Sequence, residues 1–349
     1  MLQSQPISDT CRELLPFLMS PKTGARMYSD IFKAFQAGIS PNSAAMAEFL
    51  RSSGQAKDAQ ILESIPDWDS CRRAADKQVK QAGQFNARIL CALDPEYPQL
   101  LAATESDSPG FLFVRGSLKA PDARSVAVIG SRTPTEHGSI IAERITRYLS
   151  QNAVSIVSGL ALGCDAIAHR TAIECNGHTV AVLAHGLQTV QPSENRELAK
   201  RILEGGGALV STYPFGTEVS RFNFADRDKY QAGLSEAVVM VQSSVSGGSL
   251  NAALRCLRYG RRLVVPYPTE TDQTRNRELV EGNMILATCD PDRIIEGFRN
   301  RKRSLVQKDI RAGAAGIVVL HGREDYPKIL DIPASRPQPE AAPSTGALF

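Results

Sequence analysis

The sequence lacks any apolar run of the roughly 18–20 residues that a membrane-spanning helix needs. Its opening residues, MLQSQPISDTCRELL, also lack the basic segment, apolar stretch and small-residue cleavage site of a secretory signal peptide. The sequence therefore predicts neither a membrane contact nor export. We expect a cytoplasmic protein.

Paired cysteines are also missing. The seven cysteines stand at positions 11, 71, 91, 164, 175, 256 and 289, and no two of them have the CxxC spacing. An odd and scattered set favours neither a disulfide framework nor a zinc site. We therefore expect reduced thiols and no metal ion.

A strong excess of one charge is absent as well. The chain has 40 Lys and Arg against 37 Asp and Glu, which gives a net charge of +3. This charge is too small to indicate nucleic-acid binding by itself, because many ordinary enzymes carry as much. Any phosphate-binding surface must therefore be local.

The apolar pattern divides the chain into three regions. Residues 1–80 predict a small helical domain, because apolar residues such as Leu14, Leu15 and Phe17 recur near the 3.6-residue period of a helix. Residues 81–298 form the principal domain. Residues 299–349 begin with the basic run RNRKR and end in a Pro- and Ala-rich stretch that predicts a disordered tail.

Within the principal domain, short Val- and Ile-rich runs alternate with longer amphipathic stretches. This alternation is typical of an α/β fold with a mostly parallel sheet, and uniformly apolar strands indicate helices on both faces. The predicted strands are SVAVIG, VSIVSG, TVAVLA, GALVST, AVVMVQ and RLVVPY, which start at residues 125, 154, 179, 207, 237 and 262.

Several of these strands end in Gly- and Ser-rich turns that open helices. Backbone N–H groups at a helix N-terminus are unpaired, so such a turn can bind phosphate without a catalytic side chain. In a parallel sheet the turns gather at the carboxyl ends of the strands, where ligands usually bind. This edge of the sheet is the predicted functional site.

The first turn holds Gly130, Ser131, Arg132 and Thr133. Gly130 permits close approach of the backbone, the two hydroxyls can donate hydrogen bonds, and a forked guanidinium suits phosphate oxygens. The turn does not have the GxGxxG pattern, so a dinucleotide cofactor is disfavoured. Taken alone, an N-cap serine beside a surface arginine explains the turn equally well.

The second turn begins with Ser158 and Gly159 and leads to Asp165 and His169, which lie four residues apart on one helix face. This is the spacing of a catalytic pair, but no Ser or Cys nucleophile is evident beside it. We expect Asp165 and His169 to stabilise the turn and its packing.

The third turn contains Ser246, Gly247, Gly248 and Ser249, and Ser249 is a candidate N-cap. This turn resembles a phosphate cradle more than an enzyme centre, because it carries no acid, base or nucleophile other than serine.

A fourth stretch, RFNFADRDKY, interleaves cations with aromatic rings. A single strand needs this combination, because its bases stack on rings while its backbone follows positive charge. Arg227 and Lys229 are the candidate phosphate contacts. The alternative is a loop whose aromatic side chains are core and whose charges are solvated.

Taken in order, these segments resemble the DNA-processing protein A family, also called DprA or Smf, over about residues 80–295. VAVIGSRTPTEHG is similar to the family's VGSRxxTxYG, IVSGLALGCDAIAH to its SGLAxGIDxxAH, and FADRDKYQAGLS to its FPxRNRxISGLS. The stretches LDPEYPQLL, GGSLNAALRCLRYGRRLVVP and RNRELVEGNMIL also match. Ordered motifs are far more specific together than any one of them alone.

The resemblance implies an extended Rossmann-like core that binds single-stranded DNA without catalysis and without a cofactor. It implies a homodimer that protects incoming single strands in natural transformation and loads the recombinase RecA onto them. The DNA-facing residues that it carries over are Gly130, Ser131, Arg132, Ser158, Gly159, Arg227, Lys229, Ser246 and Gly247.

The chain departs from the family pattern near the turns. Thr212 stands where the family usually has Glu, Asp228 and Lys229 where it has Asn and Arg, and Ala252 where it has Thr. These departures indicate a divergent member. No winged-helix domain is evident after residue 300.

Two other functions stay open. LOG-type phosphoribohydrolases resemble this sheet and hydrolyse nucleoside monophosphates with a PGGxGTxxE motif, whereas SGGSLNAAL has Leu254 in place of the catalytic glutamate. A nucleotide-sensing module of the SLOG type would instead bind a small nucleotide at the same turns without handling DNA.

Overall fold

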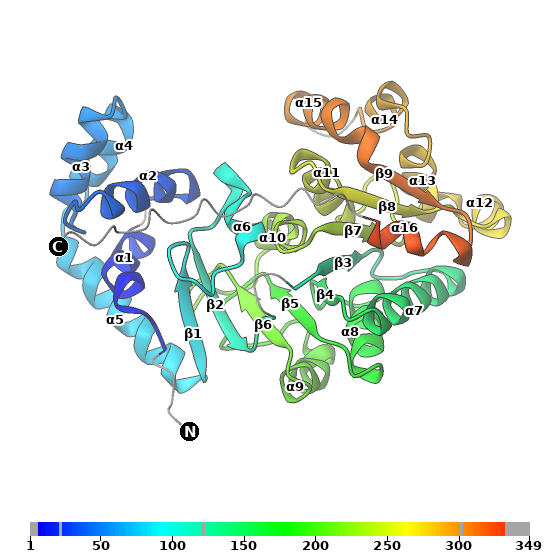
Figure 1. The fold of residues 1–349 in the computed structure, drawn as a ribbon, viewed down its shortest axis with the longest axis horizontal. Helices are drawn as coiled ribbons and strands as arrows, with labels where there is room; N and C mark the ends of the chain where they lie inside the picture. The colour runs from blue at the N-terminus through cyan, green and yellow to red at the C-terminus, as the bar shows by residue number, and fades with distance from the viewer. Residues whose placement is uncertain (1–5, 21–22, 120–122, 300–302, 332–349) are drawn as a thin grey trace, which may run out of the picture.

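One nine-stranded sheet organises the computed structural model, which describes residues 6–20, 23–119, 123–299 and 303–331 (Figure 1). Its strand order is β1-β2-β6-β5-β4-β3-β7-β8-β9. β2 is antiparallel to β1 and β6, and every other neighbouring pair is parallel. The strands are β1 (Ala87–Cys91), β2 (Phe111–Gly116), β3 (Ser125–Ile129), β4 (Ser155–Ser158), β5 (Thr179–Leu183), β6 (Ala208–Ser211), β7 (Ala237–Met240), β8 (Arg262–Pro266) and β9 (Ile317–Leu320).

The order of the parallel strands reverses between β3 and β7. β3 pairs with β4 on one side and with β7 on the other, so the chain leaves β3 and β7 in opposite directions along the sheet. Ligands of open α/β proteins bind in the crevice at such a switch point. This topology places the first and third predicted turns side by side.

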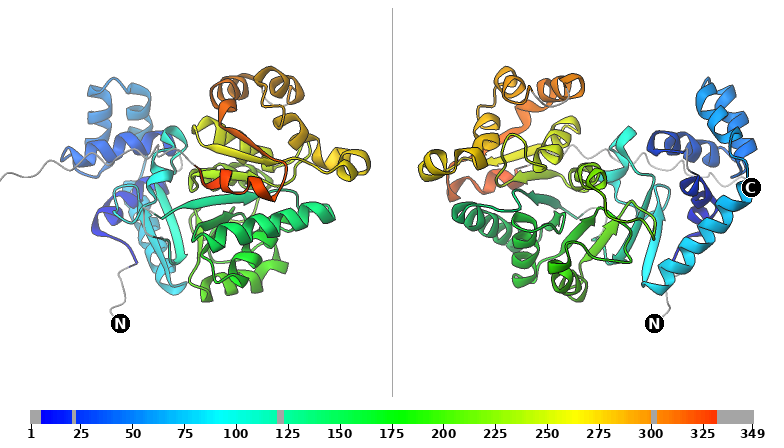
Figure 2. Two further views of the ribbon diagram at one scale, coloured as in Figure 1. Left: turned by 45° about the vertical axis from the view of Figure 1, so that its right-hand side comes forward. Right: turned by 180° about the vertical axis from the view of Figure 1, so that it is seen from behind.

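Strand β3 shows why the strands are uniformly apolar. Val126 and Val128 belong to the core on one face of the sheet, and Ala127 and Ile129 belong to the core on the other. All four are at most 2% exposed, because helices cover both faces (Figure 2). The predicted mostly parallel sheet, covered on both faces, is confirmed.

The covering helices fall into two sets. The first face carries α7 (Glu136–Gln151) and α8 (Cys164–Glu174), and the second carries α10 (Arg221–Gly233) and α11 (Ser249–Arg258). α9 (Arg196–Glu204) lies next to α8 and packs against β5 and β6. Within the described residues, no helix is both long enough and apolar enough to cross a bilayer.

Helices also make up the N-terminal region, as predicted. They lie beside β1 at one end of the sheet and share a core with β1 and β2, in which the Tyr28 ring meets the Phe111 ring edge-on at 5.3 Å. The helices are α1 (Asp9–Met19), α2 (Ala25–Gln36), α3 (Ser43–Ser52), α4 (Ala56–Glu63) and α5 (Trp68–Gln84), and a short α6 (Gln99–Ala102) follows β1.

The sheet continues beyond the boundary predicted at residue 298. The run AGIVVL contains β9, which pairs in parallel with β8, and Leu320, Tyr326 and Ile329 are buried behind it. A strand of four residues is recognised mainly by its pairing with a neighbouring strand. The short apolar run in the sequence therefore did not predict β9. The predicted disordered tail at 332–349 and Asn300 to Lys302 of the basic run lie outside the described residues. The α-helices that follow β8 are α12 (Glu270–Arg275), α13 (Arg277–Leu286), α14 (Pro291–Gly297), α15 (Arg303–Gly313) and α16 (Pro327–Leu330).

Removal of residues 300–349 should therefore destabilise the sheet. The deletion uncovers the edge of β8 and removes several buried apolar side chains, each worth about 1.5–3 kcal/mol. We expect the midpoint of thermal unfolding to fall by at least about 5 °C. A chain that ends at residue 331 is the control and should keep the full midpoint. Equal midpoints for the two truncations would show that β9 adds nothing to the fold.

Candidate functional site

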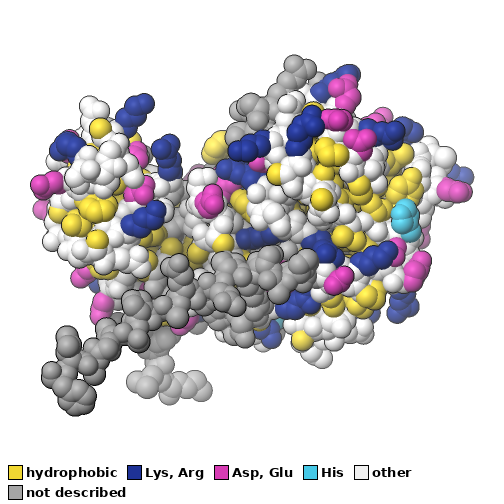
Figure 3. All heavy atoms as spheres, turned by 45° about the horizontal axis from the view of Figure 1, so that its top comes forward, with side chains coloured by type: hydrophobic (Ala, Val, Ile, Leu, Met, Phe, Trp, Pro, Cys, Tyr) yellow, Lys and Arg dark blue, Asp and Glu magenta, His cyan; other side chains and the backbone are white. Residues whose placement is uncertain are grey.

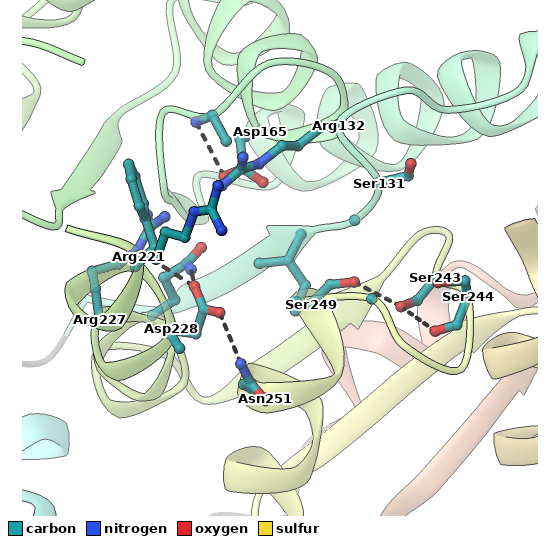
Figure 4. Close-up of a pocket in the computed structure, with 18 of the residues that line it drawn as sticks. Ser131, Arg132, Asp165, Arg221, Arg227, Asp228, Ser243, Ser244, Ser249 and Asn251 are labelled. Atoms are coloured by element: carbon teal, nitrogen blue, oxygen red, sulfur yellow. Dashed lines mark hydrogen bonds and ion pairs between the residues drawn. The ribbon is translucent and has the colours of Figure 1, made fainter. Parts of the chain in front are cut away.

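A pocket of about 330 Å³ opens at the switch point between β3 and β7. Its volume falls in the roughly 300–1,000 Å³ range of ligand sites. The lining comes from the turns after β3, β4 and β7 and from α10 (Figure 4). The fold thus brings three predicted turns and the cationic stretch to one place.

The predicted site residues divide into two groups. Those that line the pocket are Gly130, Ser131, Arg132, Arg227, Gly247, Gly248 and Ser249. Those outside its lining are Thr133, Ser158, Gly159, Lys229 and Ser246.

The first turn presents Arg132 to the pocket. The Ser131 hydroxyl accepts a hydrogen bond from the backbone N–H of Thr133 at 3.1 Å, so it shapes the turn. The guanidinium carbon of Arg132 lies 5.3 Å from the centre of the Phe224 ring, which is a cation–π contact. Because Arg132 forms no ion pair within the described ranges, its N–H groups can meet a ligand.

The second turn is held together by Asp165. Its carboxylate accepts hydrogen bonds from the backbone N–H groups of Gly159 at 3.1 Å and Ala161 at 3.3 Å. Burial raises the pKa of this carboxyl, while Arg227 and these hydrogen bonds oppose the shift. The geometry agrees with the expectation that Asp165 stabilises the turn.

His169 and Ser158 also have structural partners. The His169 ring is fully buried and its Nδ1 shares a hydrogen bond of 2.7 Å with the Thr179 hydroxyl, and burial lowers its pKa to about 3. The Ser158 hydroxyl donates to the Val128 carbonyl at 2.7 Å, which ties β4 to β3. Neither side chain reaches the pocket.

Arg227 differs from the free phosphate contact that the sequence predicted. It is only 3% exposed, its Nη1 donates to the Val182 carbonyl at 2.7 Å, and its Nε lies 3.4 Å from Asp228 Oδ1. The guanidinium packs directly over Gly159, where a Cβ would lie 1.7 Å from Nη1. Gly159 is therefore glycine because Arg227 occupies the space, and Arg227 organises the pocket from beneath.

Lys229 faces away from the pocket because its stretch is helical. The segment forms α10 with Ser220 as N-cap, and successive side chains on a helix point about 100° apart. Lys229 Nζ lies 2.5 Å from Asp226 Oδ1 and 4.8 Å from the centre of the Tyr230 ring. The alternative of a solvated loop is wrong, because the segment is a helix, and the predicted contact of this stretch with a single strand stays a prediction.

The third turn leads into α11 differently from the prediction. Gly248 is the N-cap and Ser249 is the first helical residue, whose hydroxyl donates to Ser243 Oγ at 2.9 Å. Ser246 Oγ lies 3.3 Å from Ser244 Oγ, outside the pocket lining. The N–H groups of Leu250 and Asn251 donate to the Gly247 and Gly248 carbonyls, so what favours an anion at this end of α11 is the helix dipole.

The buried amide of Asn283 sets the path of the third turn. Its Oδ1 accepts from the Ser243 N–H at 2.8 Å, and its Nδ2 donates to the Val241 carbonyl at 2.9 Å and the Pro266 carbonyl at 3.2 Å. Asn283 is 1% exposed. Sequence reasoning missed it, since one asparagine in a helix carries no signal of its tertiary partners.

Sequence reasoning also missed a polar wall of the pocket, formed by Asp228, Gln231 and Asn251. Asp228 Oδ1 accepts from Gln231 Nε2 at 3.2 Å, and Oδ2 accepts from Asn251 Nδ2 at 3.4 Å. Burial raises the pKa of Asp228 to about 6. The only signal in the sequence was that Asp228 replaces the family's asparagine.

Fold and pocket together define a Rossmann-like α/β protein with a glycine- and serine-lined pocket at the switch point of its sheet. The family model for DNA recombination-mediator protein A matches residues 88–297. The chain belongs to this family.

Known relatives agree with this assignment. The protein Smf of Escherichia coli strain K12 is 35% identical over 247 residues, which cover 70% of this chain and 64% of that protein. The chain thus spans less than two thirds of this relative. The X-ray structure of DNA processing protein A from Streptococcus pneumoniae covers 86% of this chain and 96% of its own, with a TM-score of 0.62 and 23% identity.

A second solved structure concerns DNA processing protein A from Helicobacter pylori and its single-stranded DNA binding mode. It is 26% identical to this chain, has a TM-score of 0.51, and covers 58% of this chain and 88% of its own.

Substitution Gly159→Ala should destabilise the protein by about 2–4 kcal/mol. The added methyl group would displace the Arg227 guanidinium from the Val182 carbonyl and leave buried polar groups unpaired. The matched control is Gly248→Ala, whose Cβ would lie 3.9 Å from the nearest atom, Asp228 Oδ2, and should change stability by less than about 0.5 kcal/mol. Denaturant unfolding measures both. Similar losses for the two variants would contradict the packing argument.

Substitution Asp228→Asn should stabilise the protein at pH 7.5 by on the order of 1–3 kcal/mol. The raised pKa means that ionised Asp228 costs folding free energy above about pH 6, and the cost fades as the pH falls toward the ordinary carboxyl value near 4. The gain should therefore shrink between pH 7.5 and pH 5 in thermal unfolding. Asp226→Asn, on the same helix outside the pocket, should bring no gain, and a gain for Asp228→Asn that ignores pH would refute the argument.

Proposed function

We propose that this protein binds single-stranded DNA in the switch-point pocket and catalyses no reaction there. The observation that carries the proposal is the convergence of three Gly- and Ser-rich turns, the N-terminus of α11 and exposed arginines on one pocket. Backbone N–H groups and arginine forks hold phosphates without breaking bonds. The single-stranded DNA binding mode of DNA processing protein A from Helicobacter pylori supports the same ligand.

Apolar side chains near the pocket suit the bases of an unpaired strand. Phe222 is 78% exposed and follows the pocket-lining Arg221 in the sequence, and Leu162 is 41% exposed and follows the pocket-lining Ala161. Leu279 lines the pocket and is also partly exposed. Bases stack on exposed rings largely without regard to sequence.

The positive charge that attracts the DNA strand is confined to the pocket. On the face that Figure 3 presents, Lys and Arg side chains are interspersed with Asp and Glu rather than gathered into one basic tract. A net charge of +3 agrees with this picture. Binding should therefore depend on a few phosphate contacts at the pocket and weaken with salt accordingly.

Nucleotide hydrolysis is the second candidate, and one observation favours it. The pKa of Asp228, about 6, lies in the range of a general acid or base. Against it, Leu254 packs against the core where the related hydrolases carry glutamate, and the Asp165 carboxylate is committed to its turn. Incubation with nucleoside monophosphates decides the matter, since release of free base would establish an enzyme.

Family membership supports the wider role. We propose a cytoplasmic homodimer that protects single strands during natural transformation and hands them to RecA. Co-purification with RecA on a single strand tests the partnership, and sedimentation tests the dimer.

Arg132→Ala and Arg221→Ala should each weaken binding to a single-stranded oligonucleotide. Each lost phosphate contact should reduce the slope of log K against log salt by about 0.7. Arg73→Ala is the control, because this substitution removes the same charge outside the pocket. Arg73 pairs with Asp67 in the N-terminal region. Fluorescence anisotropy at several salt concentrations measures the slopes. Slopes that match the wild type in both pocket variants would remove these arginines from the interface.

A further inference from the structure

We propose that the pocket selects guanine within the bound strand and that Asp228 reads the base. The inference rests on the proposed function, because it assigns a base preference to the same single-strand site. It follows from the unequal chemistry of the two sides of the pocket and from the acceptors that one side presents.

The two sides of the pocket differ in what they attract. Figure 4 shows Asp228 with Arg221 and Arg227 on one side and Ser131, Ser243 and Ser244 on the other. The serine side also holds the N-terminus of α11, so a phosphate is favoured there. A carboxylate opposes a phosphate and accepts hydrogen bonds instead. The base then lies against Asp228, while phosphates of the strand meet the serines and the exposed Arg132 and Arg221.

Asp228 and Gln231 supply the acceptors. They are three residues apart on α10, so they share one face of the helix, and both line the pocket. The Asp228 side chain is 14% exposed. Gln231 is 3% exposed, and its Oε1 accepts no hydrogen bond within the described part of the chain. A buried acceptor without a partner at the wall of a pocket points to a donor on the ligand.

Guanine fits this wall better than the other bases. Its Watson–Crick edge carries two adjacent donors, the N1–H and the 2-amino group, whereas adenine, cytosine and thymine each offer one donor beside acceptors. An ionised carboxylate has two acceptor oxygens and no donor, so it can take both guanine hydrogens. The asparagine that is usual in the family presents a donor NH₂ group in place of one oxygen.

The groups around Asp228 keep it in place and mostly ionised at pH 7.5. Arg227 on α10, Arg132 on the first turn and Asn251 on α11 favour its charged form, while Asp165 on α8 opposes it. Burial sets its pKa at about 6. Guanine selection should therefore be present at pH 7.5 and lost at pH 5, where a protonated carboxyl replaces one acceptor with a donor.

The test compares a thymine-only oligonucleotide with oligonucleotides that carry one central guanine, inosine or adenine. Wild-type protein at pH 7.5 should bind the guanine strand about tenfold more tightly than the thymine strand, the usual scale of a bidentate base contact. Inosine lacks the 2-amino group and should lose most of this preference. Adenine should show none.

Asp228→Asn should lose the guanine preference and bind the thymine strand more tightly, since a negative charge has left the pocket. Asp226→Asn, outside the pocket lining, should keep both affinities. Uniform tightening of every strand in Asp228→Asn, with no guanine preference in the wild type, would overturn this inference and leave single-strand binding intact. Failure of the wild type to bind any strand would overturn the proposed function and the inference with it.

Discussion

The buried guanidinium of Arg227 is the interaction on which the site depends. It joins three elements that are far apart in the sequence: the end of β5 through the Val182 carbonyl, the second turn through its packing on Gly159, and α10 itself. A buried arginine without partners would cost several kcal/mol, so these contacts define a single arrangement. The shape of the pocket follows from where Arg227 holds α10.

The same arginine governs the electrostatics of the site. Two carboxyls, Asp165 and Asp228, lie near one buried guanidinium: burial raises the pKa of both, Arg227 lowers the pKa of both, and Asp165 further raises the pKa of Asp228. Asp165 is further stabilised by two backbone N–H groups of its turn, whereas Asp228 has only side-chain donors. Burial raises the pKa of Asp228 to about 6, and its carboxylate lines the pocket. One side of the pocket thus holds a carboxylate among arginines, while the opposite side holds uncharged serines and the N-terminus of α11.

Local patterns predicted most of the fold and part of the site. Strands such as β3 and β7 are apolar on both faces, so their character is visible without knowledge of partners, and the turns that follow them carry their own glycines and serines. Features that depend on tertiary contacts could not be predicted from the sequence. The sequence does not distinguish a buried arginine such as Arg227 from an exposed one, and Asn283 shows its role only through the carbonyls that it reaches. The strand β9 likewise forms by pairing with the edge of β8.

The departures from the family pattern do not cluster at the pocket, although the sequence suggested that they do. Ala252 belongs to α11 and is fully buried in the core, and Lys229 points away to Asp226. Thr212 is absent from the lining. Of these four residues only Asp228 lines the pocket. Successive side chains of α10 point about 100° apart, so Asp228 and its neighbour Lys229 point in different directions. The divergence of the site thus reduces to one exchange, a carboxylate for an amide, which leaves the glycine- and serine-rich turns unchanged and alters one side of the pocket.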